Sequence, residues 1–507
     1  MKNIYITTPI FYVNDLPHIG HAYTTIICDT LARFHKLNGH NVLFTTGTDE
    51  HGLKVEKAAE KKGMSPKDFV DMVSKNFQDL TKKINISNTD FIRTTENRHK
   101  ESVKKFWKVL EENNQIYLSK YEGWYSIKDE SFYQEKELVK KGDELFTLDD
   151  EKVEWIEEES FFFKLSNWEK LLLEYYEKNP DFILPKSRRN EVISFVKSGL
   201  KDLSISRTSF TWGINVDNTN NHIMYVWIDA LVNYLTSLGY PNMTSQKTQY
   251  WENCIHIIGK DILKFHAIYW PAMLMAANLP LPKTIFAHGW WTNEGKKISK
   301  STGNTIDPNE IIERFGLDQF RFFLLREVTL GKDGDFSINS FKNRINADLS
   351  NNLGNLVQRT LKFLFKNFNG IIPIELNTTN LTSNPLKNAY VLSSNVEKLI
   401  MNFEINKALD LIFNYISGLN KYMDDSEPWN KIKTNKAEAA EIITQLVEGF
   451  RIIGILLQPF LPIASEKLLN NLNIENKFRE FNNLTTNYVI QKGHKINEPE
   501  ALFPRYE

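Results

Sequence analysis

The spacing of apolar residues near the start of the chain predicts a strand, a helix and a second strand. Residues 3–12, NIYITTPIFY, form a β-rich run that ends in turn residues. From Gly20, apolar residues recur at helical spacing as far as Phe34, and the Asn-Gly pair at residues 38–39 stops the helix. The run NVLFTT at residues 41–46 predicts the second strand. This order indicates a βαβ unit and therefore a parallel sheet.

The same alternation returns much later in the chain. CIHIIG at residues 254–259 and KTIFAHGW at residues 283–290 predict strands, and residues 260–279 between them predict a helix that bends at Pro271. The segment from about residue 115 to residue 222 is irregular, and it carries the acidic run DDEKVEWIEEES and a basic patch. We interpret this segment as an insertion into the sheet domain. Its basic patch consists of Lys186, Arg188 and Arg189.

Helical periodicity dominates from about residue 340. Residues 346–366, 389–423 and 436–457 each predict a helix, and together they indicate a bundle. The predicted fold is therefore α/β, with a Rossmann-type parallel-sheet domain that is split by an insertion and followed by an α-helical bundle. The predicted segments are residues 1–114 and 225–290 for the sheet domain, 115–224 for the insertion, 291–345 for a lysine loop with a linking subdomain, and 346–507 for the bundle.

Composition narrows the possible classes of protein. Apolar residues make up 41% of the 507 residues and charged residues 25%, so the chain can bury a large core. The net charge of −1 excludes a global basic field, so any nucleic acid must bind through local patches. Only two cysteines, Cys28 and Cys254, are present, which excludes a disulfide framework and a four-cysteine zinc site. No signal peptide and no apolar run of about 18 residues is present, so we expect a cytoplasmic protein.

Two histidines flank an Ile-Gly pair in PHIGH, residues 17–21, where the first helix begins. Ligands of parallel sheets bind beyond the carboxyl ends of strands, and a helix N-terminus favours anions. His18 and His21 could therefore bind phosphate, and Gly20 would let a ligand approach the backbone. A metal site with His51 would need further ligands at a recognisable spacing, and none accompanies it. Capping or packing within the fold is the third possibility.

The segment GKKISKSTGN, residues 295–304, predicts a polar loop bounded by glycine. Lys297 and Lys300 lie three residues apart and could close over a triphosphate. The segment lacks the spacing of a Walker A loop. Taken alone, it could equally be a solvated basic turn.

PHIGH and KISKS together resemble the HIGH and KMSKS motifs of class I aminoacyl-tRNA synthetases, with Ile298 where methionine is usual. Several longer stretches are similar to the methionyl-tRNA synthetase family in particular. The resemblance covers essentially the whole chain and implies a catalytic domain, an insertion and an anticodon-binding domain. The stretches are TPIFYVNDLPHIGHAYT, TTGTDEHG, VWIDALVNYLT, IIGKDILKFHAIYWPAMLM and HGWWTNEGKKISKSTGN.

The resemblance implies three groups of site residues. His18, His21, Lys297 and Lys300 would stabilise the transition state, and ATP with Mg²⁺ would contact these four together with Gly20, Gly259 and Asp261. Asp49 would hold the methionine ammonium, and Tyr12 and His266 would contact the sulfur region. The anticodon CAU of initiator and elongator tRNA(Met) would contact Asn355, Arg359 and Trp429. The remaining pocket residues would be Ile10, Trp227, Ala230, Leu231, Tyr234, Ile262 and Trp270.

The spacing of the residues agrees with such a pocket. Ile262, His266 and Trp270 are four residues apart, which places them on one stripe of an α-helix. Asn355 and Arg359 have the same spacing. An apolar pocket rich in aromatic rings suits a thioether, because sulfur packs well against ring edges.

The implied reaction has two steps. The methionine carboxylate attacks the α-phosphorus of ATP and gives methionyl-adenylate, and the 3'-terminal adenosine of tRNA then accepts the methionyl group. A carboxylate is already ionised at pH 7, so the first step needs no general base. It needs alignment and stabilisation of charge on the phosphate oxygens.

The insertion departs from relatives that bind zinc. Where those relatives have a Cys-x-x-Cys pair, this chain has Ser126 and Asp129, so we predict no structural zinc. The insertion of about 110 residues is also too short for the hydrolytic editing domain that the resemblance associates with the leucine, isoleucine and valine enzymes, so the family implies that homocysteine is rejected by cyclisation in the synthetic site. The alternatives are a small-molecule nucleotidyltransferase and a non-catalytic tRNA-binding relative. We expect a monomer that does not bind membranes.

Overall fold

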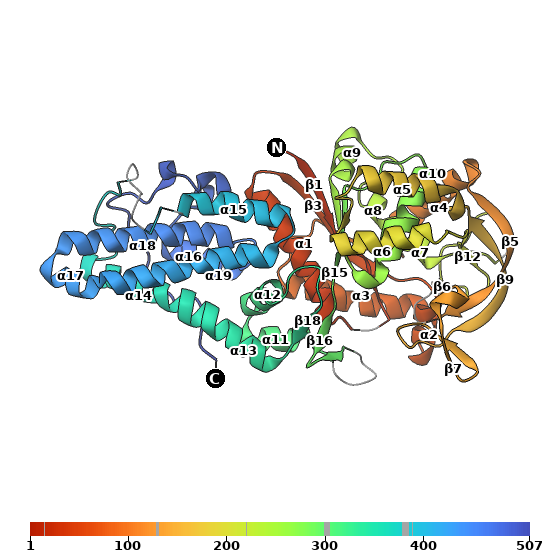
Figure 1. Ribbon diagram of the computed structural model, residues 1–507, viewed down its shortest axis with the longest axis horizontal. Coiled ribbons are helices and arrows are strands. Elements are labelled where there is room, and N and C mark those ends of the chain that lie inside the picture. The colour runs from red at the N-terminus through yellow and green to blue at the C-terminus, as the bar shows by residue number, and fades with distance from the viewer. Residues whose placement is uncertain are drawn as a thin grey trace. The chain divides into compact units, whose positions relative to one another are not determined.

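The computed structural model describes residues 1–14, 16–127, 131–219, 221–298, 305–377, 385–387 and 389–506. The chain forms two compact units (Figure 1). We call them the sheet unit, which comprises Asn3–Pro17 and Val42–His288, and the helical unit, which comprises Met1–Lys2, His18–Asn41 and Gly289–Glu507. The first long helix thus groups with the C-terminal half of the chain.

A parallel sheet forms the centre of the sheet unit, as predicted. Its strands pair in parallel: β10 with β15, β15 with β14, β14 with β1, β2 with β3, and β3 with β4. The central strands are buried on both faces, which explains their nearly continuous apolar runs. In spatial order the strands are β10 (Ile183–Leu184), β15 (Thr284–His288), β14 (Cys254–Gly259), β1 (Asn3–Thr7), β3 (Asn41–Asp49) and β2 (Phe11–Tyr12), and β4 (Asp90–Arg93) also pairs with β3.

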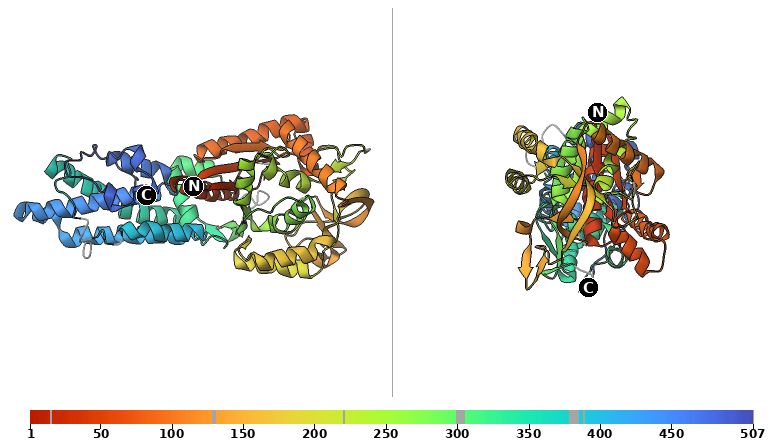
Figure 2. Two further views of the ribbon diagram at one scale, coloured as in Figure 1. Left: turned by 90° about the horizontal axis from the view of Figure 1, so that it is seen from above. Right: turned by 90° about the vertical axis from the view of Figure 1, so that its right-hand side faces the viewer.

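The insertion is more regular than its sequence indicated. The strands β5 (Ile116–Ser126) and β9 (Glu154–Phe163) form a long antiparallel pair, which appears as a twisted ribbon in Figure 2. The prediction of an irregular segment is therefore wrong, because the acidic run forms a strand whose carboxylates are largely exposed. The smaller strands are β6 (Ser131–Tyr133), β7 (Val139–Lys141), β8 (Glu144–Phe146), β11 (Leu203–Ser204), β12 (Ser206–Arg207) and β13 (Ile223–Met224).

Helices of the sheet unit build its apolar core together with the strands. They are α2 (Leu53–Lys61), α3 (Pro66–Lys83), α4 (Asn97–Glu112), α5 (Glu169–Lys178), α6 (Lys186–Lys197), α7 (Val226–Leu231), α8 (Asn233–Thr236), α9 (Ser245–Glu252) and α10 (Trp270–Ala276).

The predicted single helix at residues 260–279 is divided into three parts. A 3₁₀ turn at Lys260–Ile262 precedes a π-helical segment at Phe265–Tyr269, and α10 follows. Pro271 lies in the first turn of α10 and cannot donate to the carbonyl of Ala267 four residues earlier. The hydroxyl of Tyr176 donates to that carbonyl instead. A tertiary contact thus stabilises a local break in the helix.

The helical unit begins with α1 (Ile19–Leu37) and continues with a small sheet. In that sheet β16 (Trp291–Asn293) pairs with β17 (Lys296–Lys297) and with β18 (Gly334–Phe336). The helices α16 and α18 run side by side in the bundle (Figure 1). The helices are α11 (Pro308–Phe315), α12 (Leu317–Arg326), α13 (Ile338–Arg344), a π-helix at Ile345–Gly354, α14 (Asn355–Phe368), α15 (Ala389–Met401), α16 (Ile405–Ser426), α17 (Pro428–Thr434), α18 (Lys436–Leu457) and α19 (Pro462–Asn471).

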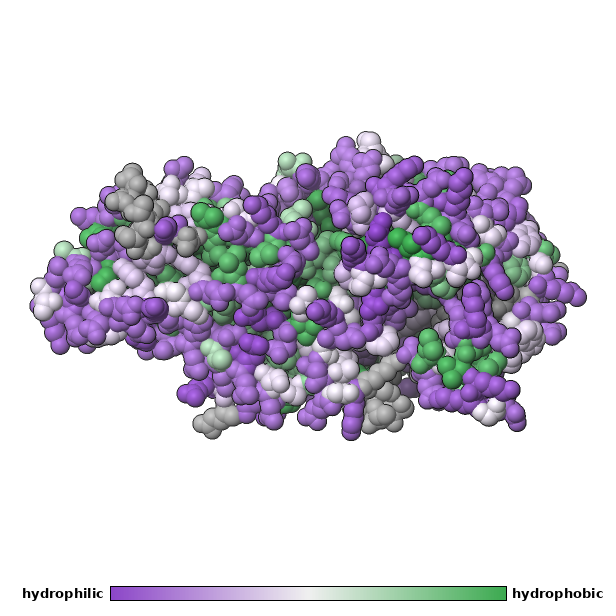
Figure 3. Space-filling view, in the orientation of Figure 1, coloured by the Kyte–Doolittle hydropathy of each residue, from purple (hydrophilic) through white to green (hydrophobic). Residues whose placement is uncertain are grey.

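The helical segments predicted from periodicity in this half of the chain are confirmed, with two divisions. The run at residues 346–366 forms a π-helix, Ile345–Gly354, followed by α14. The run at residues 389–423 forms two helices, α15 and α16, because the chain turns at Phe403, whose φ is 60°. The face of the molecule in Figure 3 is mostly hydrophilic, with small apolar groups between charged side chains. Over the described part of the chain, none of the helices combines the length and apolar character that a membrane span needs.

Candidate active site

His18 and His21 cap the first helix of the helical unit. Nδ1 of His18 accepts from the backbone N–H of Gly20 at 3.0 Å, and Nδ1 of His21 accepts from the backbone N–H of His18 at 3.0 Å. A nitrogen that accepts carries no proton, so each neutral ring carries its N–H at Nε2. A Cβ atom at Gly20 would lie 2.9 Å from Cε1 of His18, so glycine is needed for this cap. The capping possibility is confirmed, and it fixes both rings as Nε2 donors.

Contacts within the helical unit join α1 to both sides of the lysine loop. The backbone N–H of Ile19 donates to the carbonyl of Ile306, which follows the loop, at 3.2 Å. The ring of Tyr23 meets that of Trp291, which precedes the loop, edge to face with a centroid separation of 5.5 Å. The two motifs that are distant in sequence are therefore neighbours in this unit.

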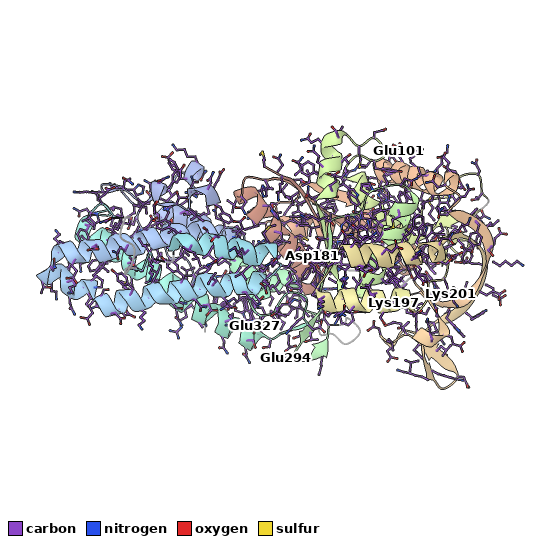
Figure 4. The ribbon with its side chains drawn as sticks, turned by 45° about the horizontal axis from the view of Figure 1, so that its top comes forward. Glu101, Asp181, Lys197, Lys201, Glu294 and Glu327 are labelled. Atoms are coloured by element: carbon purple, nitrogen blue, oxygen red, sulfur yellow. The ribbon has the colours of Figure 1, made fainter. Side chains whose placement is uncertain are left out.

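The described part of the lysine loop is a tight hairpin. Glu294, labelled in Figure 4, and Gly295 both have positive φ, 50° and 75°, where β16 turns into β17. The carboxylate of Asp335 accepts from the backbone N–H of Gly295 at 2.8 Å and fixes the turn. Lys297 is placed by its backbone pairing with Thr292, while its side chain and Lys300 lie outside the described residues.

Aromatic side chains of the sheet unit surround His266. Trp227 stacks on Phe265 with ring centroids 3.7 Å apart, and its ring lies edge-on to His266 at 6.2 Å. Tyr234 lies 6.3 Å from Trp270, ring to ring. Most of the predicted pocket residues on this side therefore form one cluster. Ala230 and Leu231 are buried in α7, whereas Trp227 and Ile262 are half-buried.

The protonation of His266 follows from its partners. Burial lowers the pKa of His266 to about 4, so the ring is neutral at pH 7. Its Nδ1 lies 3.0 Å from the carbonyl of Ile262, which can only accept, so Nδ1 carries the proton. Nε2 therefore accepts from the hydroxyl of Tyr234 at 2.7 Å. Both ring nitrogens of His266 are engaged within the protein.

The predicted α-helical stripe of Ile262, His266 and Trp270 is wrong in its geometry. Ile262 ends the 3₁₀ turn, His266 lies in the π-helical segment and Trp270 begins α10. The number of residues per turn changes along this segment, so residues that are four apart do not lie on one face as they would in a regular α-helix. π-helical segments of this kind are frequent at functional sites.

Asp49 ends β3, and its register partner in β2 is Tyr12. Its side chain is buried, with 3% of the residue exposed. Ile10, half-buried, lies between β1 and β2 near the same end of the sheet. A buried carboxylate at the carboxyl end of a strand suits an ammonium group, because burial strengthens a charge-assisted hydrogen bond.

Two polar networks form around Glu50 and His51, the residues that follow Asp49. None of Glu50, Arg93, Asp229 and His99 was singled out from the sequence. Both carboxylate oxygens of Glu50 accept from Arg93, at 2.6 and 3.0 Å. The two oxygens of Asp229 lie 2.6 Å from Nδ1 of His51 and 2.7 Å from Nε2 of His99. Burial alone would raise the pKa of Asp229, but these two histidines lower it to about 2.

The ring of His51 takes part in the network around Asp229. This ring is a partner of a carboxylate and packs on Trp212 at 5.5 Å. Across the described ranges, no group of three metal-binding side chains is found. One sign of this network in the sequence is the run Asp49-Glu50-His51 at the end of a predicted strand. Buried charged groups need partners, so such a run indicates a polar network.

Gly259 and Asp261 lie at the carboxyl end of the central strand β14. A Cβ atom at Gly259 would lie 2.4 Å from a carboxylate oxygen of Asp261, so a larger residue there would require the Asp261 side chain to move. Asp261 itself is exposed. The chain thus keeps an open backbone edge and a carboxylate at the position where parallel sheets bind ligands.

Arg359 and Trp429 come together in the helical unit. The guanidinium of Arg359 lies 5.5 Å from the ring centroid of Trp429 and 3.0 Å from a carboxylate oxygen of Asp424. Trp429 is the second residue of α17, after Pro428, and is 37% exposed, so its ring is accessible. Asn355 is exposed at the first position of α14, one turn before Arg359.

The prediction that the chain holds no structural zinc concerns positions 126 and 129. Ser126 ends β5 and is buried, and its backbone is in register with Ser131. Asp129 lies outside the described residues. The two cysteines, Cys28 and Cys254, are buried and form no disulfide.

Comparisons with known proteins cover the whole chain. The family model of class I tRNA synthetases (M) matches residues 4–145 and 142–361, and the model of the anticodon binding domain of methionyl tRNA ligase matches residues 388–507. A methionine–tRNA ligase of Rickettsia felis is 52% identical over 100% of this chain and 99% of its own length. One of Brucella suis is 46% identical over 100% and 98%.

Solved structures agree with these matches. The methionyl-tRNA synthetase of Mycobacterium tuberculosis in complex with methionyl-adenylate has a TM-score of 0.97 and 42% identity, with 100% of both chains covered. Its apo form has a TM-score of 0.89 and 40% identity, with 100% of this chain and 99% of that chain covered. The fold, the paired motifs and these full-length matches lead to one conclusion: the chain belongs to the methionyl-tRNA synthetase family of class I aminoacyl-tRNA synthetases.

Proposed function

We propose that the protein is a methionine–tRNA ligase that forms methionyl-adenylate from L-methionine and ATP and transfers the methionyl group to the 3'-terminal adenosine of tRNA(Met). The observation that carries the proposal is the linkage of α1, with its two histidine donors, to both sides of the lysine loop. A small-molecule nucleotidyltransferase has no use for an anticodon-binding bundle, and such a bundle matches residues 388–507.

Charge stabilisation carries the first step in this proposal. Nε2–H of His18 and of His21 would donate to phosphate oxygens of ATP, and Lys297 and Lys300 would add positive charge from the loop. Neither histidine needs to move a proton, because the attacking carboxylate is ionised at pH 7. Gly259 and Asp261 would lie along the adenosine.

Mg²⁺ would accompany ATP in this reaction and neutralise part of the phosphate charge. Mg²⁺ commonly keeps several waters and binds mainly to substrate phosphates. Its ligands would then be the phosphate oxygens, which fits the finding that the described residues hold no cluster of three metal-binding side chains.

Methionine selection would rest on the sheet unit. Asp49 would hold the ammonium, and the side chain would lie among Ile10, Tyr12, Trp227 and the residues around His266. Because both nitrogens of His266 are engaged, sulfur would gain no N–H from this ring, and His266 would act on it through Tyr234 and by packing. Apolar contacts discriminate related side chains by about 1–3 kcal/mol.

Anticodon binding would rest on the helical unit. The exposed ring of Trp429 can stack on an unpaired base, which contributes about 1–3 kcal/mol. Arg359, held by Asp424, and Asn355 can read base edges in the CAU anticodon of initiator and elongator tRNA(Met). Two buried cysteines that form no disulfide suit a reducing compartment, so we place the enzyme in the cytoplasm. We expect a monomer, which sedimentation would test.

Methionine-dependent exchange between ATP and pyrophosphate tests the proposal directly. The wild-type protein should catalyse the exchange with methionine and not with leucine, isoleucine or valine, and it should charge tRNA(Met). Binding of tRNA(Met) without exchange would instead indicate a non-catalytic relative. Exchange without tRNA charging would favour the nucleotidyltransferase alternative.

A further inference from the structure

A buried charge cluster within the helical unit has no part in the mechanism above. Asp29 lies on α1, about three turns beyond His18, and its side chain is fully buried. One of its carboxylate oxygens lies 2.8 Å from Nε of Arg33 and 2.7 Å from Nη1 of Arg321. Arg321, on α12, has no exposed surface. A fully buried ion pair therefore joins α1 to α12.

The same guanidinium also binds the end of a bundle helix. Nε of Arg321 donates to the carbonyl of Phe460 at 2.9 Å, and Nη2 donates to the carbonyl of Pro459 at 3.0 Å. These carbonyls lie just beyond the last residue of α18, where acceptors lack partners within the helix and the partial charge is negative. Arg321 thus binds acceptors from two different parts of the helical unit at once.

The helix that carries Arg321 is itself fixed at both ends. Near its start, the carboxylate of Asp318 accepts from the backbone N–H of Ala464, in the first turns of α19, at 2.6 Å. At its end, the carboxylate of Glu327, labelled in Figure 4, accepts from Arg344 at 3.0 Å. Only one helix, α11, lies between the lysine loop and α12 in the sequence. The position of α12 therefore limits where the loop can lie.

Stability alone does not account for such a cluster. Replacing a buried ion pair with apolar side chains of similar size is often neutral or stabilising. A planar guanidinium, in contrast, sets the direction of each of its hydrogen bonds, which lysine cannot do. Its particular contribution is therefore geometric.

We infer that Arg321 is a positioning residue for adenylate formation. Through Asp29 it holds α1, and through Pro459 and Phe460 it holds the end of α18. On the same helix, Phe323 packs on Trp291, which precedes the lysine loop, with ring centroids 5.8 Å apart. Arg321 would then fix the positions of the two ATP motifs and of the end of α18 relative to one another. The inference rests on the proposed function, because it assigns a task to Arg321 within that reaction.

The test compares Arg321→Lys and Arg321→Met with the wild-type enzyme in methionine-dependent exchange. The kcat should fall by about tenfold to a hundredfold, because small misplacements of charge-stabilising groups cost that much. The KM for methionine should change by less than about twofold, since the methionine pocket is built from residues of the sheet unit. Arg321→Lys should remain impaired although it keeps the positive charge.

A matched control is available in the bundle. Arg451 is also buried, its Nη2 lies 2.7 Å from a carboxylate oxygen of Glu448, and its Nη1 donates to the carbonyl of Asn483 at 3.0 Å. Arg451→Met should lower the melting temperature as much as Arg321→Met does, yet leave the kcat of exchange unchanged. The double variant Asp29→Leu/Arg321→Met should recover the melting temperature but not the kcat.

Three outcomes separate the possibilities. A kcat for the Arg321 variants equal to that of Arg451→Met would overturn the inference, and so would a double variant that recovers kcat together with stability. A wild-type enzyme without methionine-dependent exchange would overturn the proposed function itself, and the inference with it.

Discussion

The hydroxyl of Tyr234 donates to Nε2 of His266 at 2.7 Å, because Nδ1–H of the same ring is committed to the carbonyl of Ile262. The imidazole is therefore held in one tautomer and one orientation. A buried, neutral ring with both nitrogens engaged presents its carbon edge to neighbouring groups, and ring edges are where thioether sulfur packs well.

Replacing Tyr234 with phenylalanine should weaken methionine binding. The variant leaves Nε2 of His266 buried without a donor, which costs about 1–3 kcal/mol. We expect the KM for methionine in ATP–pyrophosphate exchange to rise about tenfold or more, with a small change in kcat. Tyr390→Phe, which removes a 2.9 Å hydrogen bond to Glu448 in the bundle, is the matched control. An unchanged KM for Tyr234→Phe would contradict the role of the pair.

Lys300→Ala should abolish adenylate formation and spare methionine binding. Lys300 is the loop lysine that we expect to stabilise the phosphates most, and it is not one of the predicted methionine-binding residues. ATP–pyrophosphate exchange measures adenylate formation, and calorimetric titration with methionine measures methionine binding. Lys296→Ala, which removes an exposed lysine at the base of the same loop, should change neither. Exchange near the wild-type rate in Lys300→Ala would refute this assignment.

Trp429→Ala should raise the KM for tRNA(Met) and leave exchange intact. The loss of one stacked base costs about 1–3 kcal/mol, which corresponds to a rise in KM of about fivefold to a hundredfold. Trp155→Ala removes another exposed tryptophan, from β9 of the insertion, and serves as the control in tRNA charging. Equal damage to exchange and to charging in Trp429→Ala would indicate a folding role.

Asp318 should make stability depend on pH. Burial raises the pKa of Asp318 to about 6, although the backbone N–H of Ala464 and the charge of Arg321 act in the opposite direction. The folded value exceeds the unfolded value of about 3.9. Its contribution to stability is therefore complete below about pH 4 and is lost as pH rises through 6, by about 3 kcal/mol in all.

Asp318→Asn keeps an acceptor for Ala464 and removes the titration. The difference in unfolding free energy between the variant and the wild type should therefore shift in favour of the variant from pH 5 to pH 7.5, as denaturant titrations would measure. Other titrating groups are common to both proteins and cancel. A difference that is independent of pH would show that Asp318 does not titrate in this range.

Elemental analysis of the purified protein should show far less than one zinc per chain. Serine at position 126 supplies no thiolate ligand. Burial raises the pKa of both the Cys28 and the Cys254 thiols, which disfavours the thiolates that zinc requires. One tightly held zinc that survives dialysis against a chelator would contradict this prediction.

Much of the fold could be predicted because local pattern and tertiary structure agree. The helix expected from Gly20 onward is α1, and the runs at residues 254–259 and 283–290 contain β14 and β15. The helix after β14 differs from its prediction because the hydroxyl that replaces the missing donor of Pro271 comes from Tyr176, far away in the sequence. The strand β9 was missed because most of its polar residues are exposed and its partner lies at residues 116–126.

The candidate site also has features that the sequence predicts and features that depend on the folded chain. Motifs predicted the ATP and methionine residues, since their spacing and order are specific, and these roles stay predictions. The network of His51, His99 and Asp229 could not be predicted, because its three members come from β3's end, α4 and α7 and meet only in the folded chain. The tautomers of His18 and His266 likewise depend on backbone positions that no spacing specifies.

The grouping of α1 with the C-terminal half of the chain has a consequence for biosynthesis. His18–Asn41 leaves the ribosome early, but the segment it belongs with, from Gly289 onward, is made only after Val42–His288. At about 5–20 residues per second the delay is on the order of tens of seconds. During that time the apolar side chains of α1 lack their final partners and are candidates for chaperone binding. The histidine motif, among the first segments to be translated, is then among the last to reach its native surroundings.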